Sequence, residues 1–190
     1  MDEYEGVLRV VTTVSETSWQ RNDKAEFEHY IRLESVTGGS LYCIDLQTLE
    51  TVASEEKFIT GETVQSVRFD GVKAYVCTAI VVTMTDPVFV FDLSNLDNIT
   101  YKDTGVIEGY STSLVQFKNG TLLGIGYSES GGLKIEIYAE TQTALESVCV
   151  FELDSVMFSE DYKSYYIDRE QGRIGLCVKD LRSGNATYYL

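Results

Sequence analysis

Short apolar segments that alternate with polar residues, and that end in glycine-containing turns, run through the whole chain. Residues 66–78 (SVRFDGVKAYVCT) hold two such segments on either side of an Asp-Gly pair, and residues 114–126 (LVQFKNGTLLGIG) repeat this arrangement around Asn-Gly. A period of two, interrupted by turns of this kind, is typical of β-hairpins. The pattern therefore predicts a chain of short antiparallel strands.

The strand, turn and strand unit recurs four times. The other two copies are residues 4–13 (YEGVLRVVTT), with a Glu-Gly turn, and residues 166–178 (YIDREQGRIGLCV), with a Gln-Gly turn. Such turns need a positive φ angle, which glycine adopts at low cost. We therefore expect four turn glycines at equivalent positions of successive four-stranded sheets, namely Gly6, Gly71, Gly120 and Gly172.

Further strand-like segments complete each unit. Third strands are expected at 40–46, 87–93, 132–138 and 185–190, and fourth strands at about 50–54, 100–107 and 145–152. Several short strands in a period of about 40 to 50 residues are typical of propeller blades. The prediction is an all-β fold, a partial β-propeller of about four blades of antiparallel strands, open at both ends. One propeller-type domain or fragment would hold blade units of about 1–61, 62–109, 110–158 and an incomplete 159–190.

The strand count bears on assembly and on the alternative fold. The first unit is expected to lack its first strand and the last unit its fourth, so neither end closes a ring. Exposed strand edges pair readily with other chains, which predicts a homodimer through open blade edges, with a closed small ring as the alternative.

A generic antiparallel sandwich is the alternative fold. The Gly-His and Trp-Asp signatures of WD40 blades are absent.

Composition supports the strand prediction and removes several classes of function. The chain has 20 Val, 11 Ile, 18 Thr and 22 aromatic residues against 7 Ala. Its 30 acidic and 15 basic residues give a net charge of −15, which opposes binding to the phosphates of nucleic acids. No apolar run reaches the roughly 18 residues that span a bilayer, and the acidic N-terminus does not resemble a signal peptide.

The four cysteines lie singly in apolar, strand-like segments, at Cys43, Cys77, Cys149 and Cys177. None has the CxxC spacing of a zinc site. We expect all four to be reduced and largely buried.

Six segments, taken in order, carry a likeness to a known family. They are GVLRVVTT (6–13), SLYCIDL (40–46), SVRFDGVKAYVCT (66–78), DPVFVFDLSN (86–95), GYSTSL (109–114) and LLGIGYSESGGLKIEIY (122–138). Together they resemble the bacterial family of secreted proteins that contain a C-terminal β-propeller domain. The resemblance implies a propeller, an extracytoplasmic location and no assigned activity. The chain lacks the family's upstream export or anchoring region and is shorter than a complete family propeller, so a fragment or truncated relative is expected.

The residue inventory offers little for catalysis. His29 is the single histidine and no GxSxG elbow is present, so a catalytic triad would depend on that one residue. The run at 92–98 (DLSNLDN) could offer Asp92, Asp97 and Asn98 to calcium, but its place between two strands favours a polar turn. No catalytic residue, metal site or cofactor is expected.

Binding residues are expected on the connections between strands. Trp19, the only tryptophan, lies in a long polar segment, 15–28, that we interpret as a loop. An aromatic residue there can anchor a partner or fold back over the core. The connections on the same face are rich in acidic residues, which favours a cationic ligand or basic protein, although such a face can also serve solubility. The candidate ligand-binding residues are Trp19, Glu26, Glu28, Glu129 and Asp161.

These observations favour a non-catalytic binding or scaffold module at the bacterial cell surface, with a protein or a cationic ligand as its partner. The alternative is a propeller enzyme with an acidic site, with or without a metal, acting on carbohydrate or small esters, because propellers host such sites. A third class is a purely structural fragment whose blade edges pair with another chain.

Overall fold

The computed structural model of the protein describes residues 1–21, 30–79, 85–105, 107–159, 161 and 163–190. These residues form β-strands, turns and one short 3-10 helix at Lys118–Gly120, which confirms the all-β prediction. They fall into two compact units, Met1–Val64 and Gln65–Leu190, and each unit is described by itself.

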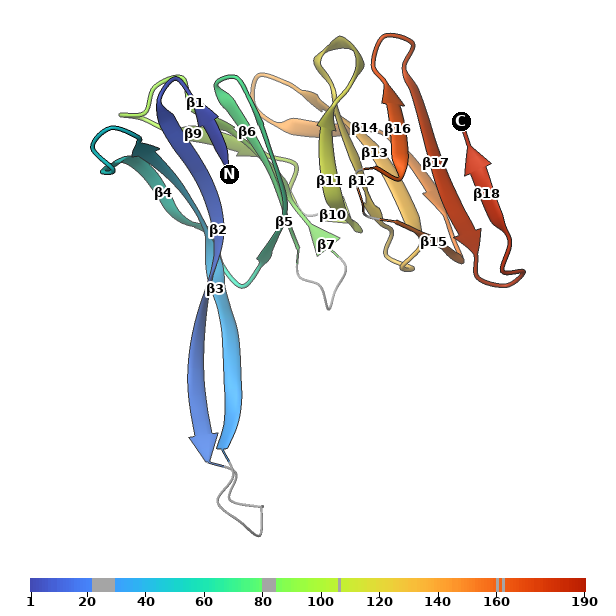
Figure 1. The fold of residues 1–190 in the computed structure, drawn as a ribbon, viewed down its shortest axis with the longest axis horizontal. Helices are drawn as coiled ribbons and strands as arrows, with labels where there is room; N and C mark the ends of the chain where they lie inside the picture. The colour runs from blue at the N-terminus through green and yellow to red at the C-terminus, as the bar shows by residue number, and fades with distance from the viewer. Residues whose placement is uncertain (22–29, 80–84, 106, 160, 162) are drawn as a thin grey trace. The chain divides into compact units, whose positions relative to one another are not determined.

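The first unit contains one antiparallel four-stranded sheet, sheet 1 (Figure 1). Its strands, in spatial order, are β1 (Asp2–Tyr4), β2 (Val7–Arg21), β3 (Tyr30–Asp45) and β4 (Thr51–Ile59). The expectation that this unit lacks a first strand is wrong, because Asp2–Tyr4 pairs with the start of β2. Both Glu5 and Gly6 have positive φ angles, of 51° and 80°, so the turn is tight enough for three residues to form a strand.

Strands β2 and β3 continue as a long hairpin where a loop is predicted. Strand β2 runs on to Arg21, and Ser15–Arg21 pairs in register with Tyr30–Val36 of β3. We call these two paired segments the arm; in Figure 1 it is the blue and cyan ribbon that extends beyond the rest of sheet 1. Alternating Thr17 and Trp19, both strand-favouring residues, continue the strand through a polar stretch. The loop interpretation is therefore wrong for residues 15–21.

The second unit contains three four-stranded antiparallel sheets. Sheet 2 consists of β5 (Thr63–Asp70, which begins at the end of the first unit), β6 (Lys73–Ala79), β8 (Val88–Asp92) and β9 (Thr100–Asp103). Sheet 3 consists of β11 (Tyr110–Gln116), β12 (Leu122–Tyr127), β13 (Leu133–Glu140) and β14 (Leu145–Leu153). Sheet 4 consists of β15 (Val156–Phe158), β16 (Tyr165–Asp168), β17 (Arg173–Asp180) and β18 (Ala186–Tyr189). A two-stranded ladder joins β7 (Thr85–Asp86) to β10 (Ile107–Glu108).

The turn glycines occupy equivalent positions, as predicted. Gly6 lies between β1 and β2, Gly71 between β5 and β6, Gly120 between β11 and β12, and Gly172 between β16 and β17. Their φ angles are all positive, at 80°, 51°, 75° and 69° respectively. Each glycine thus reverses the chain in a separate four-stranded sheet.

The inner strands of sheet 3, β12 and β13, are covered on both faces. One apolar core joins sheet 3 to sheet 2 and includes Val88 and Val90 together with Leu122 and Tyr138. A second core joins sheet 3 to sheet 4 and includes Leu123, Ile125 and Leu133 together with Leu176 and Val178. Neighbouring side chains on a strand point to opposite faces, so Leu122 and Leu123 enter different cores.

The cysteine prediction is only half correct. The four cysteines, all among the described residues, form no disulfide, and Cys43 and Cys77 are buried, but Cys149 and Cys177 are exposed. Cys149 lies on β14, where seven successive residues after Leu145 are exposed. On β17, Leu176 and Val178 point into the core and Cys177 between them points away from it. An apolar sequence context therefore does not ensure burial on these strands.

The two-sided packing of sheet 3 predicts the effect of a pair of adjacent substitutions. Leu122 and Leu123 are 2% and 0% exposed, so Leu122→Ala and Leu123→Ala should each lower the free energy of unfolding by about 2–5 kcal/mol. Urea denaturation measures both values. A loss for one variant alone, with the other within about 0.5 kcal/mol of wild type, would show that one face of β12 is open to solvent.

Candidate functional site

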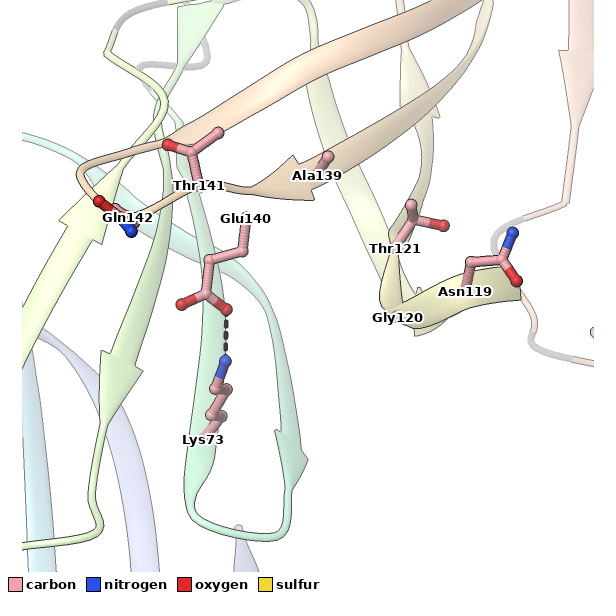
Figure 2. Close-up of a pocket in the computed structure, with 8 residues that line it drawn as sticks. All are labelled: Lys73, Asn119, Gly120, Thr121, Ala139, Glu140, Thr141 and Gln142. Atoms are coloured by element: carbon pink, nitrogen blue, oxygen red, sulfur yellow. Dashed lines mark hydrogen bonds and ion pairs between the residues drawn. The ribbon is translucent and has the colours of Figure 1, made fainter.

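A polar cleft opens between sheets 2 and 3 in the second unit. Its volume is about 590 Å³, and it is lined by Lys73, Asn119, Gly120, Thr121, Ala139, Glu140, Thr141 and Gln142. Lys73 comes from the start of β6, whereas the other residues come from sheet 3, namely the turn before β12, the end of β13 and the turn that follows β13. Figure 2 shows Lys73 and Glu140 pointing toward each other, with the Asn119–Thr121 turn across the opening.

Glu140 joins the two sheets through two lysines of sheet 2. Lys73 pairs with Glu140 Oε2, and Lys102 Nζ lies 3.2 Å from Glu140 Oε1. Lys102 Nζ also donates a hydrogen bond to the carbonyl oxygen of Thr141 at 2.9 Å. The three side chains are each between a quarter and two fifths exposed, so water still reaches this cluster.

The ion pairs set the protonation of the cleft. Burial acts to raise the pKa of Glu140, but the hydrogen bonds from Lys73 and Lys102 outweigh it, and the pKa lies below its ordinary value. The hydrogen bond to Glu140 raises the pKa of Lys73, against the effect of burial. Hydrogen bonds from Ser94 lower the pKa of Asp92, whose charge lies near both lysines. The cleft is therefore charge-balanced and suits a polar, neutral ligand better than an ion.

A second polar site lies inside sheet 3, on the face of β13 toward sheet 2. Lys134 Nζ lies 2.5 Å from Glu136 Oε2, and the two side chains are 4% and 3% exposed. Tyr138 donates a hydrogen bond to Glu136 Oε2 at 2.8 Å, and its hydroxyl lies 3.3 Å from Ser111 Oγ. Lys134 also donates to the carbonyl oxygen of Glu108. We call Lys134 and Glu136 the buried pair.

Sequence reasoning missed both of these sites. In LKIEIY the charged residues alternate with isoleucines, a pattern that predicts one solvent-facing side, yet Lys134 and Glu136 are buried. The signal that could have found them is the position of this strand in the middle of the repeat, where both faces are covered.

The predicted site residues that the structure describes, Trp19, Glu129 and Asp161, are not part of either site. Trp19 lies on the arm and is 66% exposed. Glu129 lies on the exposed turn between β12 and β13. Asp161 is exposed, and its Oδ1 accepts a hydrogen bond from the Lys163 amide at 3.0 Å. Glu26 and Glu28, like His29, lie outside the described residues. Of the three described residues, Trp19 belongs to the first unit, and Glu129 and Asp161 belong to the second.

The run at 92–98 forms a turn stabilised by side chains. Asp92 Oδ1 accepts the Ser94 amide at 2.9 Å, and Asn95 Oδ1 accepts the Asp97 amide at 3.1 Å. These bonds match the predicted polar turn. Within the described ranges, no three His, Cys, Asp or Glu side chains are placed to hold a metal ion.

The fold and its repeated sheets define a propeller-class protein of four-stranded antiparallel sheets. Residues 1–187 match the family described as "Beta propeller domain", and the chain belongs to this family. No helix long and apolar enough to cross a membrane occurs in the described part of the chain.

Two curated relatives are similar to most of the chain, and both are named only as uncharacterized proteins. The first, MJ1554 of Methanocaldococcus jannaschii, is 38% identical over 138 residues, which cover 73% of this chain and 19% of the relative. The second, from Archaeoglobus fulgidus, is 35% identical over 138 residues, covering 73% and 18%. The chain therefore spans about a fifth of the length of these relatives. Both are archaeal, so the similarity extends beyond the bacterial setting of the resemblance.

The cleft predicts a charge effect on stability with a defined pH dependence. Glu140→Gln should lower the free energy of unfolding by about 1 kcal/mol near neutral pH, because a partly exposed pair is screened. The folded pKa of Glu140 is lowered, so its contribution is present above the ordinary glutamate value and is lost as the pH falls through the folded value. Because the folded pKa of Lys73 is raised, its contribution persists up to the ordinary lysine range and is lost at higher pH.

Thermal unfolding of wild type and Glu140→Gln at several pH values and salt concentrations measures the difference in stability between the two proteins. Glu129→Gln, on an exposed turn, is the matched control and should have little effect. A Glu140→Gln penalty that stays constant down to acidic pH would mean that the ion pairs do not contribute.

Proposed function

We propose that this chain is a non-catalytic binding module that contacts another protein through the arm. The observation that carries this proposal is the exposure of the arm: all seven residues of Ser15–Arg21 are exposed, and Trp19 is 66% exposed. Contiguous exposed apolar surface marks interaction sites, whereas single exposed apolar side chains are normal, so the proposal requires Trp19 to act together with its neighbours on the arm. The side chains of Ser15–Arg21 are thus available to a partner.

The arm has residues of the kinds that dominate protein interfaces. Trp19, Arg21 and Tyr30 share one face of the ribbon, because Arg21 pairs with Tyr30 and Trp19 lies two residues before Arg21. Tyr30 is 52% exposed. Tryptophan, tyrosine and arginine are the residues most enriched among interface hot spots. This face of the arm supplies a compact anchor.

The physics of a two-stranded ribbon also favours a partner. An isolated hairpin is only marginally stable in water, and further strands or a packing surface are needed to stabilise it. A partner that covers Trp19 supplies a packing surface for the arm, and a partner that adds a strand to the arm extends its sheet. Segments 15–21 and 30–36 hold two acidic and two basic residues in a chain of net charge −15. The arm therefore avoids the repulsion that the rest of the chain imposes on acidic partners.

Engagement of the charged groups in the cleft supports binding over hydrolysis. Lys73 and Lys102 both hold Glu140, so this carboxylate is not poised to transfer protons near neutral pH. The resemblance to the secreted family supports an extracytoplasmic location, which we propose for this module.

Self-association is the second part of the proposal. All four residues of β18 are exposed, and an apolar groove of about 460 Å³ lies between β14 and β18, lined in part by Phe151, Leu176 and Tyr189. Residues 156–190 hold five acidic and five basic residues, so charge does not oppose contact there. We propose that two copies pair through β18, as the sequence suggested.

Site-specific photo-crosslinking tests both contacts. A photoreactive amino acid at position 19 should capture a defined protein in an extract of the source cells, and one at position 188 should give a covalent dimer of this chain. Position 49 is the matched control, because Leu49 is 74% exposed in the same unit as Trp19. An excess of wild-type chain should suppress capture at position 19, whereas Trp19→Ala should compete at least about tenfold less well.

The controls separate the two contacts. Capture of the same proteins from positions 19 and 49, or equal competition by Trp19→Ala, would contradict binding through the arm. If the chain stayed monomeric at all concentrations and gave no crosslinks from position 188, pairing through β18 would be contradicted. Binding through the arm would not be affected by that result.

A further inference from the structure

The buried pair forms part of the wall of a cavity of about 370 Å³. This volume falls in the range of small-molecule sites. The cavity lies in the second unit, beside β10, β13 and β14. Its lining residues are Ile107, Glu108, Lys134, Glu136, Ser147, Val150 and Glu152.

The fold does not require charged residues at this place. Removing two charges from water costs several kcal/mol per ion, and well-packed apolar residues often serve stability as well or better. The opposite face of β13 is packed with apolar residues instead: Leu133 is buried, and Ile135 and Ile137 pack in the second core. Stability alone thus does not account for a buried ion pair here, and a few polar groups in the wall of a pocket are typical of small-molecule sites.

The neighbouring residues make room for this polar arrangement. Gly124 faces Glu136 in the register of β12 and β13, and a Cβ added there would lie 2.3 Å from Ser111 Oγ. A Cβ added at Gly109 would lie 2.9 Å from Lys134 Cδ. Glycines at these two positions let Ser111 and Lys134 occupy their places without a clash.

We propose that this cavity binds a small organic cation with an N–H-bearing ammonium or guanidinium group. Three glutamates, Glu108, Glu136 and Glu152, belong to its lining against the single lysine Lys134, so the net charge of the lining favours a cation. Both hydrogen bonds that hold Glu136 arrive at Oε2, and Oε1 has acceptor capacity to offer a ligand. Ile107 and Val150 supply apolar surface for a short aliphatic chain.

Titration with n-butylammonium chloride, followed by NMR on the backbone amides of Ser147 and Val150, tests this proposal. Tetramethylammonium chloride at equal ionic strength is the probe control, because it has the charge but no N–H donor. Butylammonium should give saturable shifts at these amides, and tetramethylammonium should give none. Equal shifts with both salts, or no saturation with butylammonium, would overturn the proposal.

Two variants locate the binding. Glu152 is exposed, so Glu152→Gln should fold normally and bind butylammonium about tenfold more weakly, which is the loss expected for one charged hydrogen bond. Glu146→Gln, on the same strand and also exposed but not part of the cavity lining, should bind like wild type. Equal affinity of the two variants would place the cation elsewhere on this acidic chain and overturn the proposal.

Discussion

The burial of sheet 3 on both faces is the constraint on which the second unit depends. A strand sends alternate side chains to opposite faces, so each residue of β12 and β13 must suit the face that it enters. Leu122 and Leu123 meet this requirement by entering two separate apolar cores. A polar residue that is buried in these strands must find its partners within the protein, because it has given up its contacts with water.

The charged residues of β13 follow from this constraint in two ways. Lys134 and Glu136 are inside the sheet and satisfy one another, with Tyr138 as a further donor. Glu140, at the end of the same strand, is partly exposed and pairs instead with Lys73 and Lys102 of sheet 2. The interior pair is costly for the fold and borders a cavity, whereas the outer cluster connects two sheets at a place that water reaches. We therefore assign the ligand to the interior pair.

The repeat made the sheets predictable, since the glycine turns and the alternating segments are local features. The sequence pattern misled where the surroundings of a strand decide the outcome. Polar residues in Ser15–Arg21 suggested a loop, but pairing with Tyr30–Val36 makes them a strand. Apolar neighbours suggested burial of Cys149, but the outer strand β14 leaves it exposed. Lys134 and Glu136 alternate with isoleucines in LKIEIY, yet the sheet packed on their face buries them, which the alternation alone does not reveal.

Native-state hydrogen exchange on the purified chain tests the two-sided burial of sheet 3 most directly. Amides of β12 and β13 should open only through global unfolding of the second unit and exchange slowest, whereas the solvent-exposed arm should exchange through small local openings. Low concentrations of denaturant should leave the exchange rates of the arm amides unchanged. The same concentrations should accelerate exchange of the β12 and β13 amides together. Exchange of β12 or β13 as fast as that of the arm would contradict the account.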